Sequence, residues 1–278
     1  ATALAFAAAI IFSASLTSCA TQSNFTEAEL TVANQSLYVP EKIEWKEISQ
    51  GIAASDYCSK EFPVEYHLVK IELKTDGMTI AAYPTAQMAK ERLESGIKTD
   101  SFFKGISTTS FARQFKTAVA LNTTPFNVKE GAAVLALMGN SRSFAGIHKI
   151  EGIQFSEPQE KYAALVFSTE NGFLKADILD SQKTEFLEQY QYAFGGFFTI
   201  LRDGEKKSFK TASLDCRTAC GISQDGFTVY FLAVEGPPSL TNKGLTYPQC
   251  ADILLKAGAY SAMQFDGGSS TQMCLGTK

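Results

Sequence analysis

The chain has 278 residues, of which 45% are hydrophobic and 19% are charged, so it can bury a substantial hydrophobic core. Its formal net charge is −4, and no run of Lys or Arg residues marks a basic stripe. These features exclude the usual electrostatic signature of a nucleic-acid-binding protein, and we expect no nucleic acid among its partners.

The first 18 residues differ in composition from the rest. Residues 1–16 are apolar, small and uncharged, and they lead into Leu16-Thr17-Ser18-Cys19. The apolar run is too short for a transmembrane helix, which needs about 20 apolar residues. The run and the small residues after it are typical of a secretory signal peptide.

Leu-Thr-Ser-Cys resembles a bacterial lipoprotein lipobox. The resemblance implies a lipoprotein signal peptide at 1–18, cleavage before Cys19 and lipidation of its thiol; an ordinary secretory signal is the alternative. We therefore expect an exported lipoprotein of the cell envelope, anchored to the membrane by its lipid. Residues 19–60 are predicted to form a tether and an irregular N-terminal segment. Because neither Met nor a basic segment precedes Ala1, we expect the N-terminus to be truncated.

Cysteine usage fits export but does not define a metal site. Five cysteines remain besides Cys19, so at least one has no partner within the chain. Cys216 and Cys220 are four residues apart, and no second pair stands at metal-binding spacing, so we expect no zinc site. No cofactor is expected, although an acidic edge could bind a hard cation such as calcium.

The body of the chain reads as short strands with a few helices. Residues 64–73 alternate apolar and polar side chains, which predicts a half-buried strand, and residues 78–83 are predicted to return as a second. Helices are predicted at residues 85–95 and 108–115. Asn171-Gly172 is a strong hairpin signal. Further strands are predicted at 144–150, 162–168, 173–179, 197–202, 218–223, 227–234 and 260–265.

The clearest helix begins after Thr246. Gln249 completes a T-x-x-Q capping box, and Pro248 is tolerated in the first turn. Gly258 is placed to end the helix in the left-handed conformation. Together these elements predict a single α+β domain with a mostly antiparallel sheet and a few packed helices.

The segment from Phe265 to Thr271 reads Phe-Asp-Gly-Gly-Ser-Ser-Thr and directly follows a predicted strand. Glycines let the backbone turn sharply and approach a ligand closely. The hydroxyls and free N–H groups can then hold an anion or a sugar, beside the acid Asp266. The alternative is a tight turn in which Asp266 bonds its own backbone.

Four pieces in order resemble the phosphodiester glycosidase family, whose members include the lysosomal enzyme that removes N-acetylglucosamine from a phosphodiester. They are Asn122 after an apolar run, FTILRDG at 198–204, RTACG at 217–221, and the helix–strand–DGGSS unit. The resemblance spans roughly residues 64–275. It implies a phosphodiester glycosidase-like domain over residues 61–278, truncated at its C-terminus, because family members continue into further strand.

The resemblance also implies an activity: an enzyme that hydrolyses a glycosyl phosphodiester in envelope or exopolysaccharide material. The alternative is a glycan- or phosphate-binding lipoprotein on the same fold without catalysis; a purely structural envelope lipoprotein is a third reading. The chain departs from the family pattern at Thr123-Thr124-Pro125, where glycines and Phe are usual, at Ser269, which replaces a third glycine, and at Pro237-Pro238.

Candidate site residues follow from this chemistry. Asp266 is the first carboxylate candidate, as nucleophile or base, and Glu235 is the second. Arg217 is the candidate for gripping phosphate, because a guanidinium binds phosphate oxygens in pairs and stays charged. The candidates for binding substrate are Gly267, Gly268, Ser269, Asn122 and His67.

Overall fold

The computed structural model describes residues 26–59, 61–98, 103–128, 141–210, 213–237 and 241–276. The predicted signal peptide, Cys19 and Pro238 lie outside the described residues. Within these ranges, no helix has both the length and the apolar character needed to span a membrane.

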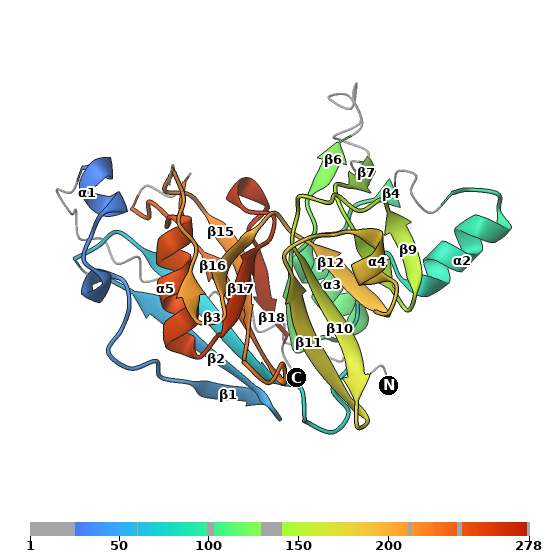
Figure 1. The fold of residues 1–278 in the computed structure, drawn as a ribbon, viewed down its shortest axis with the longest axis horizontal. Coiled ribbons are helices and arrows are strands. Elements are labelled where there is room, and N and C mark those ends of the chain that lie inside the picture. Colours follow the sequence, from blue (N-terminus) through green and yellow to red (C-terminus); the bar gives the residue numbers. More distant parts are fainter. Residues whose placement is uncertain are drawn as a thin grey trace, which may run out of the picture.

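The fold is built on an eight-stranded sheet in which every neighbouring pair is antiparallel (Figure 1). Its order is β1-β2-β3-β16-β15-β17-β13-β14. The strands are β1 (Lys46–Ser49), β2 (Ile52–Cys58), β3 (Glu65–Glu72), β16 (Thr228–Val234), β15 (Arg217–Ile222), β17 (Ser261–Gln264), β13 (Thr199–Arg202) and β14 (Glu205–Lys206).

A five-stranded antiparallel sheet, of order β11-β10-β12-β8-β9, lies beside it. Two small sheets complete the strands of the described residues, a two-stranded sheet β18-β5 and a three-stranded sheet β4-β7-β6. These strands are β11 (Phe173–Leu179), β10 (Ala164–Glu170), β12 (Tyr192–Gly195), β8 (His148–Ile150), β9 (Ile153–Ser156), β18 (Met273–Leu275), β5 (Val119–Leu121), β4 (Phe103–Lys104), β7 (Ser141–Phe144) and β6 (Phe126–Val128).

The helices are short and few. They are α1 (Glu27–Thr31), α2 (Ala86–Glu94), α3 (Thr108–Phe115), α4 (Thr184–Leu187) and α5 (Tyr247–Ala257), with single turns η1 (Gln35–Leu37) and η3 (Gly268–Ser270). The capping box of α5 is present, and Gly258 ends the helix at φ 109°. The expectation of an α+β fold with a mostly antiparallel sheet is confirmed.

Two hydrophobic cores lie on the two faces of the large sheet. On one face, α5 packs Ile253 and Leu254 against Leu68 and Leu232. On the other face, Phe231 and Phe265 belong to a core shared with Phe167 and Phe194 of the five-stranded sheet. Successive side chains of a strand point to opposite faces, so each central strand contributes to both cores.

Two sequence predictions about the N-terminal half are wrong. β1 and β2 pair into the large sheet, so residues 46–58 belong to the folded domain rather than to an irregular segment. Residues 78–83, predicted as a strand, run without a β-ladder and line a cavity instead. The hairpin at Asn171-Gly172 is confirmed, because both residues have positive φ, 51° and 84°.

Candidate active site

A cleft of about 520 Å³ opens at one end of the central strands of the large sheet. Three walls enclose it. They are the strand ends where β3 begins and β16 ends, the loop after β17, and the start of α3. The polar residues that line it are His67, Glu235, Gly268, Ser269, Ser107, Thr108, Thr109, Thr271 and Gln272. Four predicted site residues, His67, Glu235, Gly268 and Ser269, therefore meet in one cleft.

The register of β3 and β16 brings His67 and Glu235 together. His67 lies opposite Ala233, and the Glu235 N–H donates to the Glu65 carbonyl at 2.9 Å. Since side chains alternate along a strand, His67, Ala233 and Glu235 share one face. The two functional side chains are 168 residues apart in the chain, yet their tips are 3.4 Å apart.

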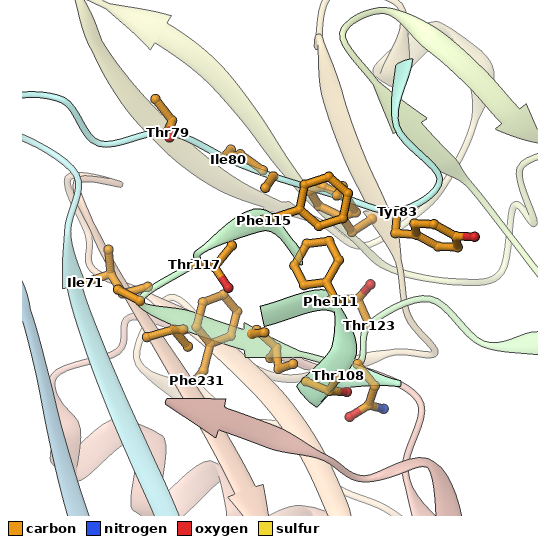
Figure 2. Close-up of a pocket in the computed structure, with 18 of the residues that line it drawn as sticks. Ile71, Thr79, Ile80, Tyr83, Thr108, Phe111, Phe115, Thr117, Thr123 and Phe231 are labelled. Atoms are coloured by element: carbon orange, nitrogen blue, oxygen red, sulfur yellow. The ribbon is translucent and has the colours of Figure 1, made fainter. Parts of the chain in front are cut away.

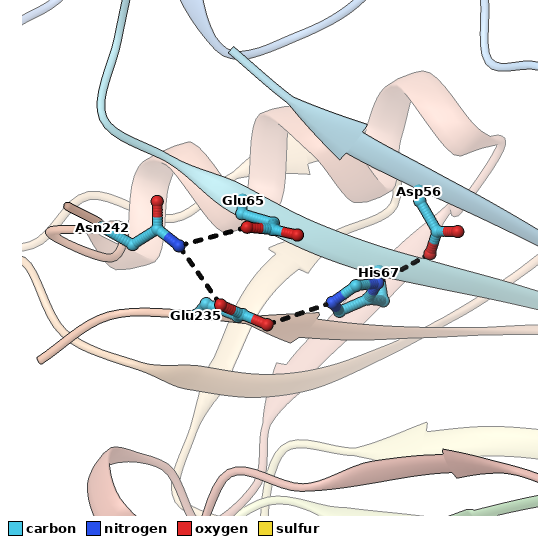
Figure 3. Close-up of polar contacts among 5 residues, drawn as sticks. All are labelled: Asp56, Glu65, His67, Glu235 and Asn242. Carbon is cyan, nitrogen blue, oxygen red and sulfur yellow. Dashed lines mark hydrogen bonds and ion pairs between the residues drawn. The ribbon is translucent and has the colours of Figure 1, made fainter. Parts of the chain in front are cut away.

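His67 stands between two carboxylates in a polar chain (Figure 3). Its Nδ1 is 2.6 Å from Asp56 Oδ1, and its Nε2 is 3.4 Å from Glu235 Oε1. Asn242 Nδ2 donates to Glu235 Oε2 at 3.2 Å and to Glu65 Oε2 at 3.3 Å. Both oxygens of Glu235 are therefore held in place, and about a third of its side chain stays exposed.

The geometry favours a protonated His67. A neutral imidazole donates one N–H, whereas both ring nitrogens of His67 face a carboxylate oxygen. Burial on its own lowers the pKa of His67, but the hydrogen bonds and charges of Asp56 and Glu235 outweigh burial and raise the pKa above 6.5. The imidazolium offsets part of the negative charge beside Glu235.

This raised pKa makes stability depend on pH. The folded state binds the His67 proton more tightly than the unfolded chain, so its contribution to stability is complete below about pH 6.5 and is lost as pH rises through the folded pKa. We expect the difference in unfolding free energy between the wild type and His67→Gln to fall over the pH range above about 6.5, the ordinary pKa of histidine. Urea unfolding of both proteins at each pH measures it.

The comparison with His67→Gln isolates this residue from the other histidine. His148 is buried, and burial lowers its pKa to about 3, so its contribution to stability has the opposite sign. Because His148 is unchanged in both proteins, its effect cancels in the difference. A difference that stays constant over this pH range would contradict the protonated state of His67.

The same cluster is where a cation could bind. Glu65, His67 and Glu235 each offer one ligand atom, and these atoms lie within 4.8 Å of one another. Carboxylate oxygens suit hard cations, and imidazole suits transition metals. A metal at Glu235 would compete with the proton on His67, because both would use the imidazole nitrogen that faces Glu235.

Asp266 does not line the cleft, although Gly268 and Ser269 of the same loop do. Its backbone N–H donates to the Thr123 carbonyl at 3.0 Å, and its own carbonyl accepts from Asn122 Nδ2 at 2.7 Å. Asn122 Oδ1 accepts from Thr218 Oγ1 and from the Gln272 N–H, both at 2.9 Å. Asn122 thus ties the Asp266 loop to the neighbouring strands, and Asp266 is among the lining residues of neither cavity.

The Asp266 carboxyl group is half-buried, and burial raises its pKa above the usual value of 3.8, while the Ser270 hydroxyl and the Gly267 N–H act in the opposite direction. Gly267 permits the loop to lie close to β15, since a Cβ there would stand 3.0 Å from the Cys216 carbonyl oxygen. Gly268 has φ 57°, in the left-handed region that favours glycine. These two glycines place Ser269 at the cleft.

Arg217 is engaged within the protein. Its Nε donates to the Leu245 carbonyl at 3.0 Å, its Nη2 donates to the Ser213 carbonyl at 2.6 Å, and the guanidinium lies 4.0 Å from the centre of the Tyr247 ring. Strand alternation explains this position. Ala219, two residues on, faces the α5 core, whereas Thr218 bonds Asn122 on the other side.

Sequence reasoning did not single out several residues of the site. Asp56, Glu65 and Asn242 hold His67 and Glu235, and Ser107 and Thr109 line the cleft at the start of α3. The run of hydroxyl residues at the start of α3 was the one signal in the sequence that could have indicated this wall. Asp56 and Asn242 carry no local motif: the pairing of β2 with β3 places Asp56 opposite His67, and Asn242 lies in the loop before α5.

Comparison with known proteins identifies the family of this chain. The sequence model of the family described as phosphodiester glycosidase matches residues 115–278, which is more than half of the chain. Glu235, Asn122, Arg217 and the Asp266 loop lie within the match, whereas His67 precedes it. No curated protein sequence matches the chain.

Three solved structures share the fold at low sequence identity. A protein from Burkholderia pseudomallei has a TM-score of 0.54 at 11% identity, covering 77% of this chain and 69% of its own. A protein from Synechocystis has a TM-score of 0.57 at 13% identity over 84% of this chain; the match spans 60% of that protein.

The third is the catalytic domain of zebrafish N-acetylglucosamine-1-phosphodiester alpha-N-acetylglucosaminidase, auto-inhibited by its pro-peptide. Its TM-score is 0.50 at 14% identity, over 91% of this chain and 85% of the zebrafish domain. The family match and the shared fold agree with the resemblance seen in the sequence. The chain belongs to the phosphodiester glycosidase family and is an enzyme of that class.

Proposed function

We propose that the protein hydrolyses a glycosyl phosphodiester of envelope or exopolysaccharide material in the cleft between Glu235 and the start of α3. The family supports hydrolysis of a sugar–phosphate diester. The observation that carries the proposal is the position of Glu235: both of its oxygens are held, and it faces a cleft whose other walls are rich in hydroxyls.

Charge divides the cleft into two ends. One wall carries three carboxylates, those of Asp56, Glu65 and Glu235, and only one imidazole, that of His67. Its net negative charge repels a phosphate anion. Another wall is formed by the start of α3, and helix N-termini attract anions through free N–H groups and the helix dipole. The phosphate of the substrate therefore lies at Ser107, Thr108 and Thr109, with Ser269 beside it, and the sugar lies toward Glu235.

Hydrolysis in this orientation uses Glu235 as the base. A water oxygen bonds to the anomeric carbon while the bond between that carbon and the phosphate oxygen breaks, and its electron pair stays on the phosphate monoester. The water proton passes to Glu235 and then to solvent. The transition state carries positive charge on the sugar, which the nearby carboxylates stabilise.

The other residues of the site have separate roles. Protonated His67 and Asn242 orient the Glu235 carboxylate, and Gly268 and Ser269 contact the substrate. Asn122, Gly267 and Asp266 hold the loop that carries Ser269, and Arg217 fixes the start of β15 against α5. These four are positioning residues in the proposal.

The test is hydrolysis of an α-N-acetylglucosaminyl phosphodiester in water enriched in heavy oxygen. We expect free N-acetylglucosamine and a phosphate monoester, with the heavy oxygen on the sugar, because the bond that breaks is the one to the anomeric carbon. Release of sugar 1-phosphate with the label on phosphorus would contradict the proposal, since it indicates cleavage at phosphate. Absence of turnover with tight substrate binding by calorimetry would favour the binding-protein alternative.

The cellular location is part of the same proposal. It is supported by the apolar segment before Leu16-Thr17-Ser18-Cys19. Partitioning of the expressed precursor into detergent tests the lipid anchor, and a Cys19→Ala variant that partitions like the wild type would rule the anchor out.

A further inference from the structure

A second and larger cavity, of about 1100 Å³, is drawn in Figure 2, and it shares lining residues with the cleft. Its side chains are mainly aromatic and aliphatic, and Figure 2 shows Phe111, Phe115, Phe231, Ile71 and Ile80 around it. Among the described residues that line it, the charged ones are Asp76, Lys116 and Arg142. We call this cavity the apolar groove.

The apolar groove adjoins the cleft. Ser107, Thr108, Ser269 and Gln272 line both, so the two spaces meet at the polar residues assigned above to the phosphate. A ligand whose phosphate lies at this junction has one side in the polar cleft and the other in the groove.

Helix α3 sets the direction of such a ligand. Its first residue, Thr108, stands at the junction, whereas Phe111 and Phe115 line the groove one and two turns later. The two rings are 4.7 Å apart, as expected for residues four positions apart on a helix. A chain that leaves the phosphate therefore runs along the aromatic face of α3.

We propose that the groove binds the apolar aglycone of the substrate, so that the preferred substrate is a sugar phosphodiester of a long hydrocarbon alcohol. This inference rests on the proposed function, since it uses the phosphate position at the start of α3. A polar aglycone such as a second sugar would leave the aromatic surface without a partner, whereas an alkyl or isoprenoid chain removes it from water. The groove is also far larger than a methyl or glyceryl group requires.

The experiment compares methyl, butyl and octyl α-N-acetylglucosaminyl phosphates, each below its micelle-forming concentration. Each methylene that enters the groove should raise kcat/KM about fourfold, so octyl, with its extra methylenes, should exceed butyl by about 250-fold. Binding of n-octyl phosphate, measured by calorimetry, tests the groove without turnover. Equal kcat/KM for methyl and octyl substrates would overturn the proposal.

Matched variants locate the effect. Phe111→Ser and Ile80→Ser should each reduce the octyl-to-methyl ratio at least about tenfold, while Phe186→Ser, on the exposed side of α4, should leave it unchanged. Ile80 lies in a segment without strand or helix, so Ile80→Ser should disturb folding less than Phe111→Ser. It can therefore test the proposal if Phe111→Ser does not fold. A ratio insensitive to both groove variants would overturn the proposal.

The two proposals fail in different ways. Hydrolysis of all three substrates at one rate would support the proposed function but contradict the proposal that the groove binds an apolar aglycone. Octyl phosphate binding that depends on Phe111, without hydrolysis of any substrate, would support the groove and contradict the proposed function. If another part of the chain or a second copy fills the groove, octyl phosphate will not bind, and the inference fails.

Discussion

Glu235→Gln should lower kcat on a glycosyl phosphodiester by about 10²–10⁴-fold, because the amide cannot accept the proton of the attacking water. The substitution keeps the shape of the side chain, and its carbonyl oxygen can still face His67 or Asn242. We therefore expect a small change in KM. Steady-state kinetics on the substrate described above measure both constants.

Glu65→Gln is the matched control for this variant. Glu65 shares the Asn242 amide with Glu235, yet it is not among the residues that line the cleft. Its kcat should stay within about tenfold of the wild type, below the loss expected for a general base. If Glu235→Gln and Glu65→Gln lose activity equally, the cluster acts through its total charge, and Glu235 is not the base.

Phe265→Ala should reduce the free energy of unfolding by about 3–5 kcal/mol. Phe265 is 1% exposed and lies in the core between the two sheets, one residue before the Asp266 loop. Removing its ring leaves a cavity that sheets on both sides cannot easily close. The midpoint of urea unfolding, with the slope compared to that of the wild type, measures the loss.

Phe186→Ala provides the reference for this measurement. Phe186 is 44% exposed on α4, so its removal should change stability by no more than about 0.5 kcal/mol. A loss below about 1.5 kcal/mol for Phe265→Ala would mean that the sheets close over the missing ring, and the core would then be less tightly packed than the structure shows.

The sequence predicts local elements well where one segment carries all the information. The capping box Thr246–Gln249 and Gly258 determine α5 from within a dozen residues, and Asn171-Gly172 determines a hairpin in the same way. Residues 78–83 mislead because an apolar pattern arises equally in a strand and in a segment that lines a groove. β2 (IAASDYC) lacks clear alternation in its sequence, although the folded strand buries Ile52 and Ala54 in the core between the sheets.

The site is harder to predict, because it depends on the register of paired strands and on which face of the sheet each side chain points to. His67 and Glu235 were each identifiable, but their contact follows from the pairing of strands far apart in sequence. Arg217 shows the effect of side-chain alternation. It is adjacent to Thr218 in the sequence, but neighbouring side chains of a strand point to opposite faces of the sheet. Whether these residues carry the assigned roles stays a prediction for the experiments above.

The central position of β3 has a consequence for how the protein can be divided. The family match begins at residue 115, whereas β3 spans Glu65–Glu72 and pairs along the whole length of β16. A fragment restricted to the matched region would turn β16 into an edge strand, with a row of unpaired N–H and C=O groups beside a buried apolar face. Such a fragment would self-associate through this edge, and it would lack His67. A lack of activity in the fragment would therefore not show that the full chain is inactive.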